Sequence, residues 1–269
     1  MRELKCELYH DNFQNYKRYD IPRAQLVIAD IPYNLANNAY ASSPEWYIGG
    51  DSKNGESAKA NKSFFSTDEK FNIAEYFHFC SKLMKNEPKE KNCAPCMIIF
   101  CSHQQQATVL ESAKSHGFKN HIPLVFIKQT SPQVLKANMK IVGATEYALV
   151  LYRDKLPKFR NKGNMILNWF EYRRDEYTPK IHETQKPVNL LKRLIEIFTD
   201  KGDVVIDPVA GSAATLRAAY ELQRHGYGFE VSKKYYTLAK NRMLNDMAIQ
   251  ESFEDEFYLN ENYDQIVFV

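Results

Sequence analysis

Val204-Val-Ile-Asp-Pro-Val-Ala-Gly-Ser-Ala-Ala-Thr215 has the pattern of a buried strand, a tight turn and the start of a helix. A second apolar run downstream, at 227–230, ends in the acid Glu230. Small residues after one strand and a carboxylate after the next are how doubly wound sheets hold a nucleoside. The turn has one glycine, Gly211, and matches neither the dinucleotide fingerprint nor the P-loop. We therefore expect a nucleoside without a pyrophosphate, such as S-adenosylmethionine.

The rest of the chain alternates short apolar runs with helix-period segments, which is typical of an α/β domain with a mostly parallel sheet. The pattern predicts strands at 26–29, 97–101, 122–127, 147–152, 204–207 and 227–230. It predicts helices at 73–84, 104–116, 187–198, 213–224 and 233–246. No clear helix separates the third and fourth strands, so we expect them to form an antiparallel hairpin at one edge of the sheet.

Composition narrows the class of protein. The chain has 269 residues, 44% of them hydrophobic, which is enough for a sizeable core. No apolar stretch approaches the roughly 20 residues needed to span a bilayer, and the first residues lack the apolar core of a signal peptide, so we expect a cytoplasmic protein. Five cysteines is an odd number, which favours reduced thiols. Cys93 and Cys96 have zinc-ligand spacing, but no second such pair exists, and we expect no metal.

The charge is unevenly distributed. Residues 246–269 hold seven acids and no Lys or Arg, so the remaining residues carry +10 against a whole-chain charge of +3. A basic body suits a nucleic-acid backbone. Polar stretches at 34–67 and 132–143 are expected to be loops, either plain surface loops or loops over a site. The segment 156–183 interleaves basic and aromatic residues, which suits a nucleic-acid surface, although a solvated excursion has the same pattern.

Asp30-Ile-Pro-Tyr33 directly follows the predicted strand at 26–29. Asp30 therefore places a carboxylate at the carboxyl end of a strand, where α/β sheets bind their ligands, and Tyr33 adds an aromatic face. On its own, this pattern is more typical of an ordinary strand-to-loop turn.

The motifs acquire meaning from their order. Asp30–Tyr33, Thr184-Gln-Lys-Pro187, the turn after 204–207 and Glu230 together resemble the amino-methyltransferases of DNA. The catalytic motif precedes the cofactor motif, as in the β class of that family, and the likeness covers nearly the whole chain. The resemblance implies a Rossmann-like, S-adenosylmethionine-dependent methyltransferase fold with a circularly permuted motif order. It implies one domain over residues 1–269, with a small target-recognition insertion at 156–183.

The resemblance also assigns roles. Asp30 and the Ile31 carbonyl would accept hydrogen bonds from the target amino group, Pro32 would stiffen the turn, and Tyr33 would stack on a base flipped out of the duplex. Ile31 stands where the family usually has proline. The cofactor would be bound by Asp11, Thr184, Gln185, Lys186, Asp207, Pro208, Ala210, Gly211, Ser212 and Glu230. Among these, Glu230 would bind the ribose and Asp11 would lie near the adenine.

Three further positions bear on the site. Ala213 stands where the family usually has a second glycine, and it fits if its φ is negative. Glu146 and the glutamine triplet 104–106 are expected to have no catalytic role, the triplet being the polar first turn of a helix.

An aspartate at the start of the catalytic motif favours adenine N6, because the family's cytosine-N4 enzymes usually have serine there. We therefore expect an adenine-N6 DNA methyltransferase, of the restriction–modification type, from a bacterium or phage. Its substrate would be double-stranded DNA, and this class often dimerises. A cytosine-N4 or RNA methyltransferase, or an inactive partner subunit that binds S-adenosylmethionine and nucleic acid, remain alternatives.

Overall fold

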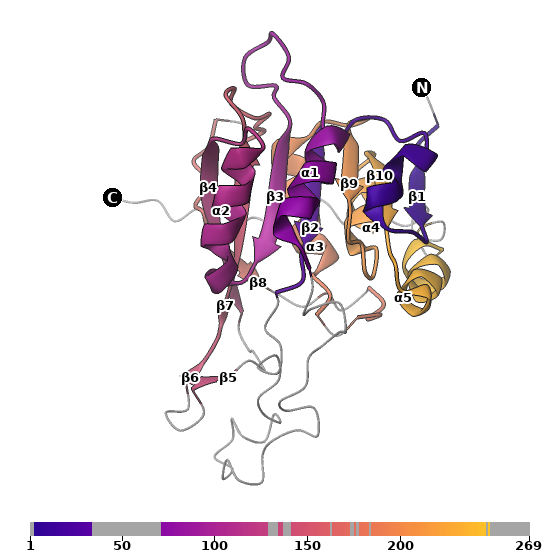
Figure 1. Ribbon diagram of the computed structural model, residues 1–269. Helices are drawn as coiled ribbons and strands as arrows, with labels where there is room; N and C mark the ends of the chain where they lie inside the picture. Colours follow the sequence, from indigo (N-terminus) through magenta and orange to yellow (C-terminus); the bar gives the residue numbers. More distant parts are fainter. Residues whose placement is uncertain are drawn as a thin grey trace.

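The computed structural model describes residues 3–33, 71–128, 134–136, 141–161, 163–172, 175, 178–182, 184–245 and 247. The loop predicted at 34–67, much of that at 132–143 and most of the acidic tail lie outside the described residues. An eight-stranded sheet forms the centre, with strand order β1-β10-β9-β2-β3-β7-β4-β8 (Figure 1). Its strands are β1 (Cys6–Tyr9), β2 (Leu26–Asp30), β3 (Cys96–Cys101), β4 (Asn120–Lys128), β7 (Thr145–Tyr152), β8 (Trp169–Tyr172), β9 (Val204–Asp207) and β10 (His225–Phe229). This arrangement confirms the predicted α/β class.

Helices cover both faces of the sheet (Figure 1). One face packs against α1 (Ile73–Leu83), α2 (Gln106–Ser115) and the 3-10 helix η1 (Phe13–Arg18), and the other against α3 (Val188–Phe198) and α4 (Ala214–Glu221). The chain after β10 forms α5 (Lys233–Leu238) and a π-helical continuation, η6 (Ala239–Leu244). The sheet is therefore doubly wound.

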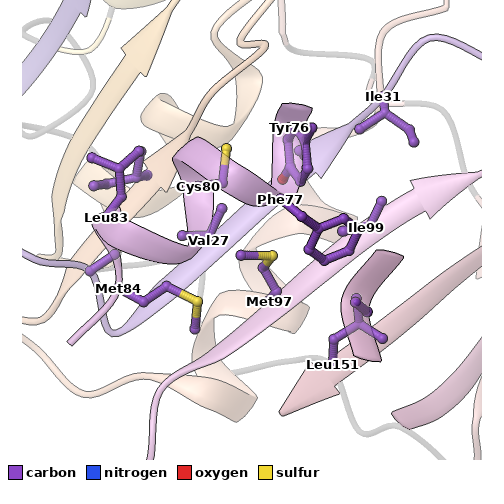
Figure 2. Packing of buried hydrophobic residues seen from close by; sticks show 14 of the residues in the cluster. Val27, Ile31, Tyr76, Phe77, Cys80, Leu83, Met84, Met97, Ile99 and Leu151 are labelled. Atoms are coloured by element: carbon purple, nitrogen blue, oxygen red, sulfur yellow. The ribbon is translucent and has the colours of Figure 1, made fainter. Parts of the chain in front are cut away.

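Alternation along each central strand feeds both cores. In β2, Val27 and Ala29 pack on the α1 face, while Leu26 and Ile28 pack on the α3 face. Figure 2 shows α1 lying across β2 and β3 on the first face, with Tyr76 of α1 among the labelled core residues. Because both faces are buried, β2 and β9 are apolar at every position before their last residue.

The strand order reverses direction between β2 and β9. From β2 the chain passes through α1 to β3 on one side, and from β9 it passes through α4 to β10 on the other. Ligands of open α/β sheets bind at such a switch point, outside the carboxyl ends of the strands. The two strands that flank this point end in Asp30 and Asp207.

The predicted antiparallel hairpin forms: β4 pairs with β7, and β7 is also antiparallel to β3. However, β8 adds to β4 in parallel and occupies the edge, so the hairpin lies one strand inside it. A separate two-stranded sheet, β5 (Val134–Lys136) and β6 (Ile141–Val142), lies beyond the carboxyl ends of the parallel strands (Figure 1). Among the described residues, no helix is both long and apolar enough to cross a membrane.

Two basic residues of the 156–183 segment form ion pairs with acidic residues of this chain. Lys158 Nζ lies 2.6 Å from Asp203 Oδ2 and 2.8 Å from Asp200 Oδ2, and its side chain is 10% exposed. Arg160 holds Asp200 through two hydrogen bonds of 2.6 Å. These two side chains therefore contribute ion pairs to the fold, although the sequence pattern had grouped them with a nucleic-acid surface.

Candidate active site

Asp30 presents one bonded and one free carboxylate oxygen. Its Oδ2 accepts a hydrogen bond of 2.7 Å from Lys186 Nζ, while its Oδ1 is buried and has no hydrogen-bond partner among the described residues. Burial raises the pKa of Asp30, with the Lys186 ammonium opposing the shift and the Glu146 carboxylate adding to it. The site therefore holds a buried acceptor that can receive a hydrogen bond from a ligand.

Lys186 is the centre of the site. Its ammonium lies 3.1 Å from Glu146 Oε2 and 3.4 Å from the Tyr33 hydroxyl, in addition to the bond to Asp30. It also lies 5.1 Å from the centre of the Phe100 ring, and the side chain is 6% exposed. The resemblance placed Lys186 in the cofactor group; the structure brings it against Asp30 and Tyr33, the two side chains of the catalytic motif.

Glu146 is a site residue that the sequence reasoning missed. It binds Lys186 on one side and Lys128 of β4 on the other, and its side chain is 12% exposed. Burial opposes ionisation, but the two ammonium groups outweigh it and lower the pKa of Glu146. The sequence did contain a signal for Glu146. Glu146, Ala148 and Val150 follow one another at every second position, so Glu146 lies on the same strand face as two core residues. An acid on a buried strand face needs a cation.

The second half of the site lies at the ends of β9 and β10. Asp207 Oδ1 accepts a hydrogen bond of 3.1 Å from the Val209 N–H, and burial raises the pKa of Asp207 to about 7. Glu230 accepts hydrogen bonds from the Gly211 N–H (2.9 Å) and the Ser232 N–H (2.6 Å). Its pKa is raised by burial. Pro208, Ala210 and Ser212 lie in the turn that joins these two acids.

The backbone at Ala213 does not have the negative φ at which an alanine would fit without strain. Its φ is +61°, in the left-handed region, and its side chain is fully buried. The condition under which alanine fits here, a negative φ, is therefore not met; the turn closes through a hydrogen bond from the Ala213 N–H to the Ala210 carbonyl (2.7 Å) just before α4 begins. Gly211 also has a positive φ, of +51°.

The other predicted cofactor residues make bonds within the chain. Gln185 accepts a hydrogen bond from the Ile181 N–H (3.0 Å), and Thr184 Oγ1 lies 3.0 Å from His182 Nδ1. Asp11 follows β1 and has both oxygens engaged. It accepts hydrogen bonds from the Asn12 N–H (2.8 Å), the Asn15 amide (2.7 Å) and the Tyr19 hydroxyl (2.9 Å). Contacts of these residues with the cofactor stay predictions.

These residues fit a nucleoside that carries a positive charge. Asp207 and Glu230 come from the ends of neighbouring strands, and burial raises the pKa of each, so a positively charged ligand beside them would favour their ionised forms. A Cβ added at Gly211 would meet nothing closer than the Val209 carbonyl oxygen at 4.0 Å, so the turn has open space beside it. In the described part of the chain, no three His, Cys, Asp or Glu side chains group as a metal site requires, and all five cysteines are free thiols.

Comparison with known proteins defines the class. Residues 24–241 match the family model of DNA methylases, and the chain belongs to this family. The family's methyl donor, and hence the cofactor of this chain, is S-adenosylmethionine.

Individual relatives agree with this assignment. The type II methyltransferase M.HpaI of Haemophilus parainfluenzae is 39% identical over 86% of this chain and 71% of its own length. The DNA adenine methyltransferase YhdJ of Escherichia coli is 25% identical over 94% of this chain and 86% of its own length. A local match to M.HindIII of Haemophilus influenzae is 48% identical over 62 residues, which is 20% of that enzyme.

Solved structures share the fold. The complex of M1.HpyAVI with S-adenosylmethionine superposes with a TM-score of 0.61 at 20% identity, over 88% of this chain and 98% of that one. The cytosine-N4-specific PvuII DNA methyltransferase gives 0.60 at 13% identity, over 91% of each chain. The Rossmann-like methyltransferase fold is thus confirmed.

Proposed function

We propose that this DNA methyltransferase transfers its methyl group to the N6 amino group of adenine in a specific DNA sequence. The observation that carries the proposal is Asp30, whose Oδ2 is fixed by Lys186 while the buried Oδ1 remains open. An aspartate at this position favours adenine by resemblance, and the relative YhdJ is named as a DNA adenine methyltransferase.

The main contribution of the protein to this reaction would be to position the amine and the methyl donor. When bound, S-adenosylmethionine supplies an electrophilic methyl group on its sulfonium. The exocyclic amine of adenine is a poor nucleophile, because its lone pair is delocalised into the ring. Two acceptors, Asp30 Oδ1 and the Ile31 carbonyl, would favour a pyramidal nitrogen whose lone pair faces the methyl group. Burial raises the pKa of Asp30, which makes Oδ1 a better acceptor for the proton that the amine loses.

The target base has to leave the duplex to reach this site. A base inside the stack cannot approach the end of β2, so it would flip out and stack on Tyr33. We assign recognition of the surrounding DNA to the segment 156–183, in which Trp169 is 40% exposed at the sheet edge. Homodimerisation is a prediction from the class alone.

Asp30→Ala tests the assignment. The variant should lose methylation, because the amine loses its side-chain acceptor, while S-adenosylmethionine binding stays nearly intact. Nucleoside digestion and mass spectrometry after reaction would identify the product. Activity that persists in Asp30→Ala would refute the role of Asp30. If the wild-type product is 4-methylcytosine without 6-methyladenine, the choice of adenine is wrong, and no product at all would favour an inactive partner subunit.

A further inference from the structure

Gln105 lies in the turn after β3, the strand beside β2, and its side chain contacts the catalytic motif. It ends the 3-10 turn His103–Gln105 (η4) that follows β3. Its Oε1 accepts hydrogen bonds from the N–H and the hydroxyl of Ser102, at 3.0 and 3.1 Å, and its Nε2 donates to the Pro32 carbonyl at 2.8 Å. The side chain is 7% exposed. The sequence had assigned this glutamine only to a polar helical turn, so its contact with Pro32 was not foreseen.

The segment between Asp30 and Tyr33 is fixed to β3 at two points. The Ile31 N–H donates to the Phe100 carbonyl at 3.2 Å, which continues the β2–β3 pairing one residue beyond Asp30. The Ile31 side chain is buried in the α1-face core (Figure 2). Pro32 has no N–H, so its carbonyl is the only backbone group through which it can be held. Gln105 supplies that bond.

The two ends of the Gln105 amide have separate consequences. The oxygen binds Ser102 and completes the turn that starts η4, which is a local structural task. The nitrogen binds the peptide between Pro32 and Tyr33, which lies between the proposed acceptor at Ile31 and the proposed stacking ring. A change in that peptide would reorient both groups relative to Asp30.

We propose that Gln105 is a positioning residue for methyl transfer, which holds the Ile31 carbonyl and the Tyr33 ring in their working directions through the Pro32 carbonyl. This proposal rests on the proposed function of the Asp30–Tyr33 motif. Among the described residues, the side-chain hydrogen bonds of Gln105 join it to Ser102 and Pro32, so its loss should lower the rate of the chemical step and leave the affinity for S-adenosylmethionine unchanged. Misplacement of reacting groups by about 1 Å can cost roughly 10²-fold in rate.

Gln105→Glu separates the two tasks. A carboxylate keeps an oxygen for Ser102 but cannot donate to the Pro32 carbonyl, whereas the protonated carboxyl can do both. Gln104→Glu is the matched control, because Gln104 lies in the same turn and is exposed. Single-turnover methylation of unmethylated genomic DNA would be measured between about pH 6 and about pH 9 at saturating S-adenosylmethionine, with the Kd of the cofactor from titration calorimetry.

We expect Gln105→Glu to be about 10- to 100-fold slower than wild type at the alkaline end. Its rate relative to wild type should recover as the pH falls and the carboxyl gains its proton, with the Kd within about twofold throughout. Gln104→Glu should follow wild type at every pH. At alkaline pH, hydrogen exchange at the Ile31 amide should be faster in Gln105→Glu than in wild type.

Two outcomes would overturn the proposal. One is a wild-type rate in Gln105→Glu at alkaline pH. The other is a pH-independent loss accompanied by an equal loss of cofactor affinity, which would mean a purely structural role. Failure of the proposed function is distinguishable, because it would appear as the absence of 6-methyladenine in the wild-type reaction, before any variant is compared.

Discussion

Two clusters of charged side chains, each built around a buried lysine, lie at opposite ends of the parallel strands, and they differ in how completely their carboxylates are bonded. The carboxyl-end cluster consists of Asp30, Glu146, Lys128 and Lys186. The amino-end cluster consists of Asp203, Asp200, Lys85, Lys158 and Arg160. Both pair acids with cations, yet only one of them leaves an acceptor open.

Asp203 is fully bonded. Its Oδ1 binds Lys85 at 3.0 Å, and its Oδ2 binds Lys158 at 2.6 Å and the Asp200 N–H at 2.8 Å. Burial opposes ionisation of Asp203, but these donors outweigh it and lower its pKa. Asp30 has one cation and an open oxygen, and its pKa is raised. An unbonded buried acceptor costs stability. The amino-end cluster is therefore arranged for stability, and the carboxyl-end cluster retains a cost that binding of a ligand can relieve.

The largest difference should appear when each cluster loses its most buried lysine. Lys186→Met leaves Asp30 and Glu146 facing each other without their shared cation, which would raise the pKa of Asp30 further and disorder the acceptor. We expect methyl transfer to fall about 10²- to 10³-fold, as when one preorganised group of an active site is removed. Single-turnover rates at saturating cofactor would measure it.

Lys158→Met is the matched control. Lys158 is 10% exposed and is also held by two carboxylates, so both variants should lose about 3–5 kcal/mol of unfolding free energy. Only Lys186→Met should lose activity per folded molecule. Equal activity losses in the two variants would contradict the functional distinction between the clusters.

Asp203→Asn should reduce stability with a defined pH dependence. We expect a loss of about 3 kcal/mol at neutral pH, because Lys158 loses the more buried of its two carboxylate partners and Lys85 also loses its partner. The folded-state pKa of Asp203 lies below the ordinary aspartate value of 3.8, so its stabilisation is present above that pH and is lost as the pH falls through the folded value. Urea unfolding should thus give wild type and variant curves that converge under acid conditions. A difference that grows on acidification would contradict the sign of this shift.

The parts of the site that could be predicted from sequence are those fixed by the strands themselves. Asp30, Asp207 and Glu230 each follow a short apolar run, and parallel strands bring such endings to one edge. The helices predicted at 213–224 and 233–246, after β9, rested on the same regular pattern. The edge strands β1 and β8 were missed, because a run of four residues is too short to give a clear period.

The partners of these acids could not be predicted, because they depend on register. Glu146 reaches Lys186 and Lys128 only because β7 runs antiparallel between β3 and β4. Gln105 follows β3 and reaches Pro32 at the end of the adjacent strand β2, with a sequence separation of 73. Such contacts are set by the assembled sheet, and no local spacing in the chain encodes them.

The turn after β9, in the cofactor half of the site, can be tested through Gly228 of β10. A Cβ there would lie 2.7 Å from Leu216 Cδ1 and 3.0 Å from Ala210 Cβ. Gly228→Ala should therefore displace α4 or the turn and cost about 1–3 kcal/mol of unfolding free energy, with weaker cofactor binding. Gly226→Ala is the comparison: its Cβ would lie 3.3 Å from the Leu216 carbonyl oxygen, which is tight but longer than the contacts at Gly228, so we expect a smaller loss. If thermal melting and calorimetry show the same small effect for both, the packing at Gly228 is not limiting.

The smallest expected effect concerns the protonation of Asp207. The pKa of this carboxyl-end aspartate is raised, whereas the pKa of Asp203 at the amino end is lowered. Burial raises the pKa of Asp207 to about 7, so near neutral pH a positively charged ligand should favour its ionised form. The affinity for S-adenosylmethionine should then rise by up to about tenfold between roughly pH 6 and pH 8, as the carboxyl loses its proton. Titration calorimetry across this range would measure it. Asp207→Asn should bind more weakly at the alkaline end and show no such rise; an equal rise in the variant would assign the pH dependence to another group.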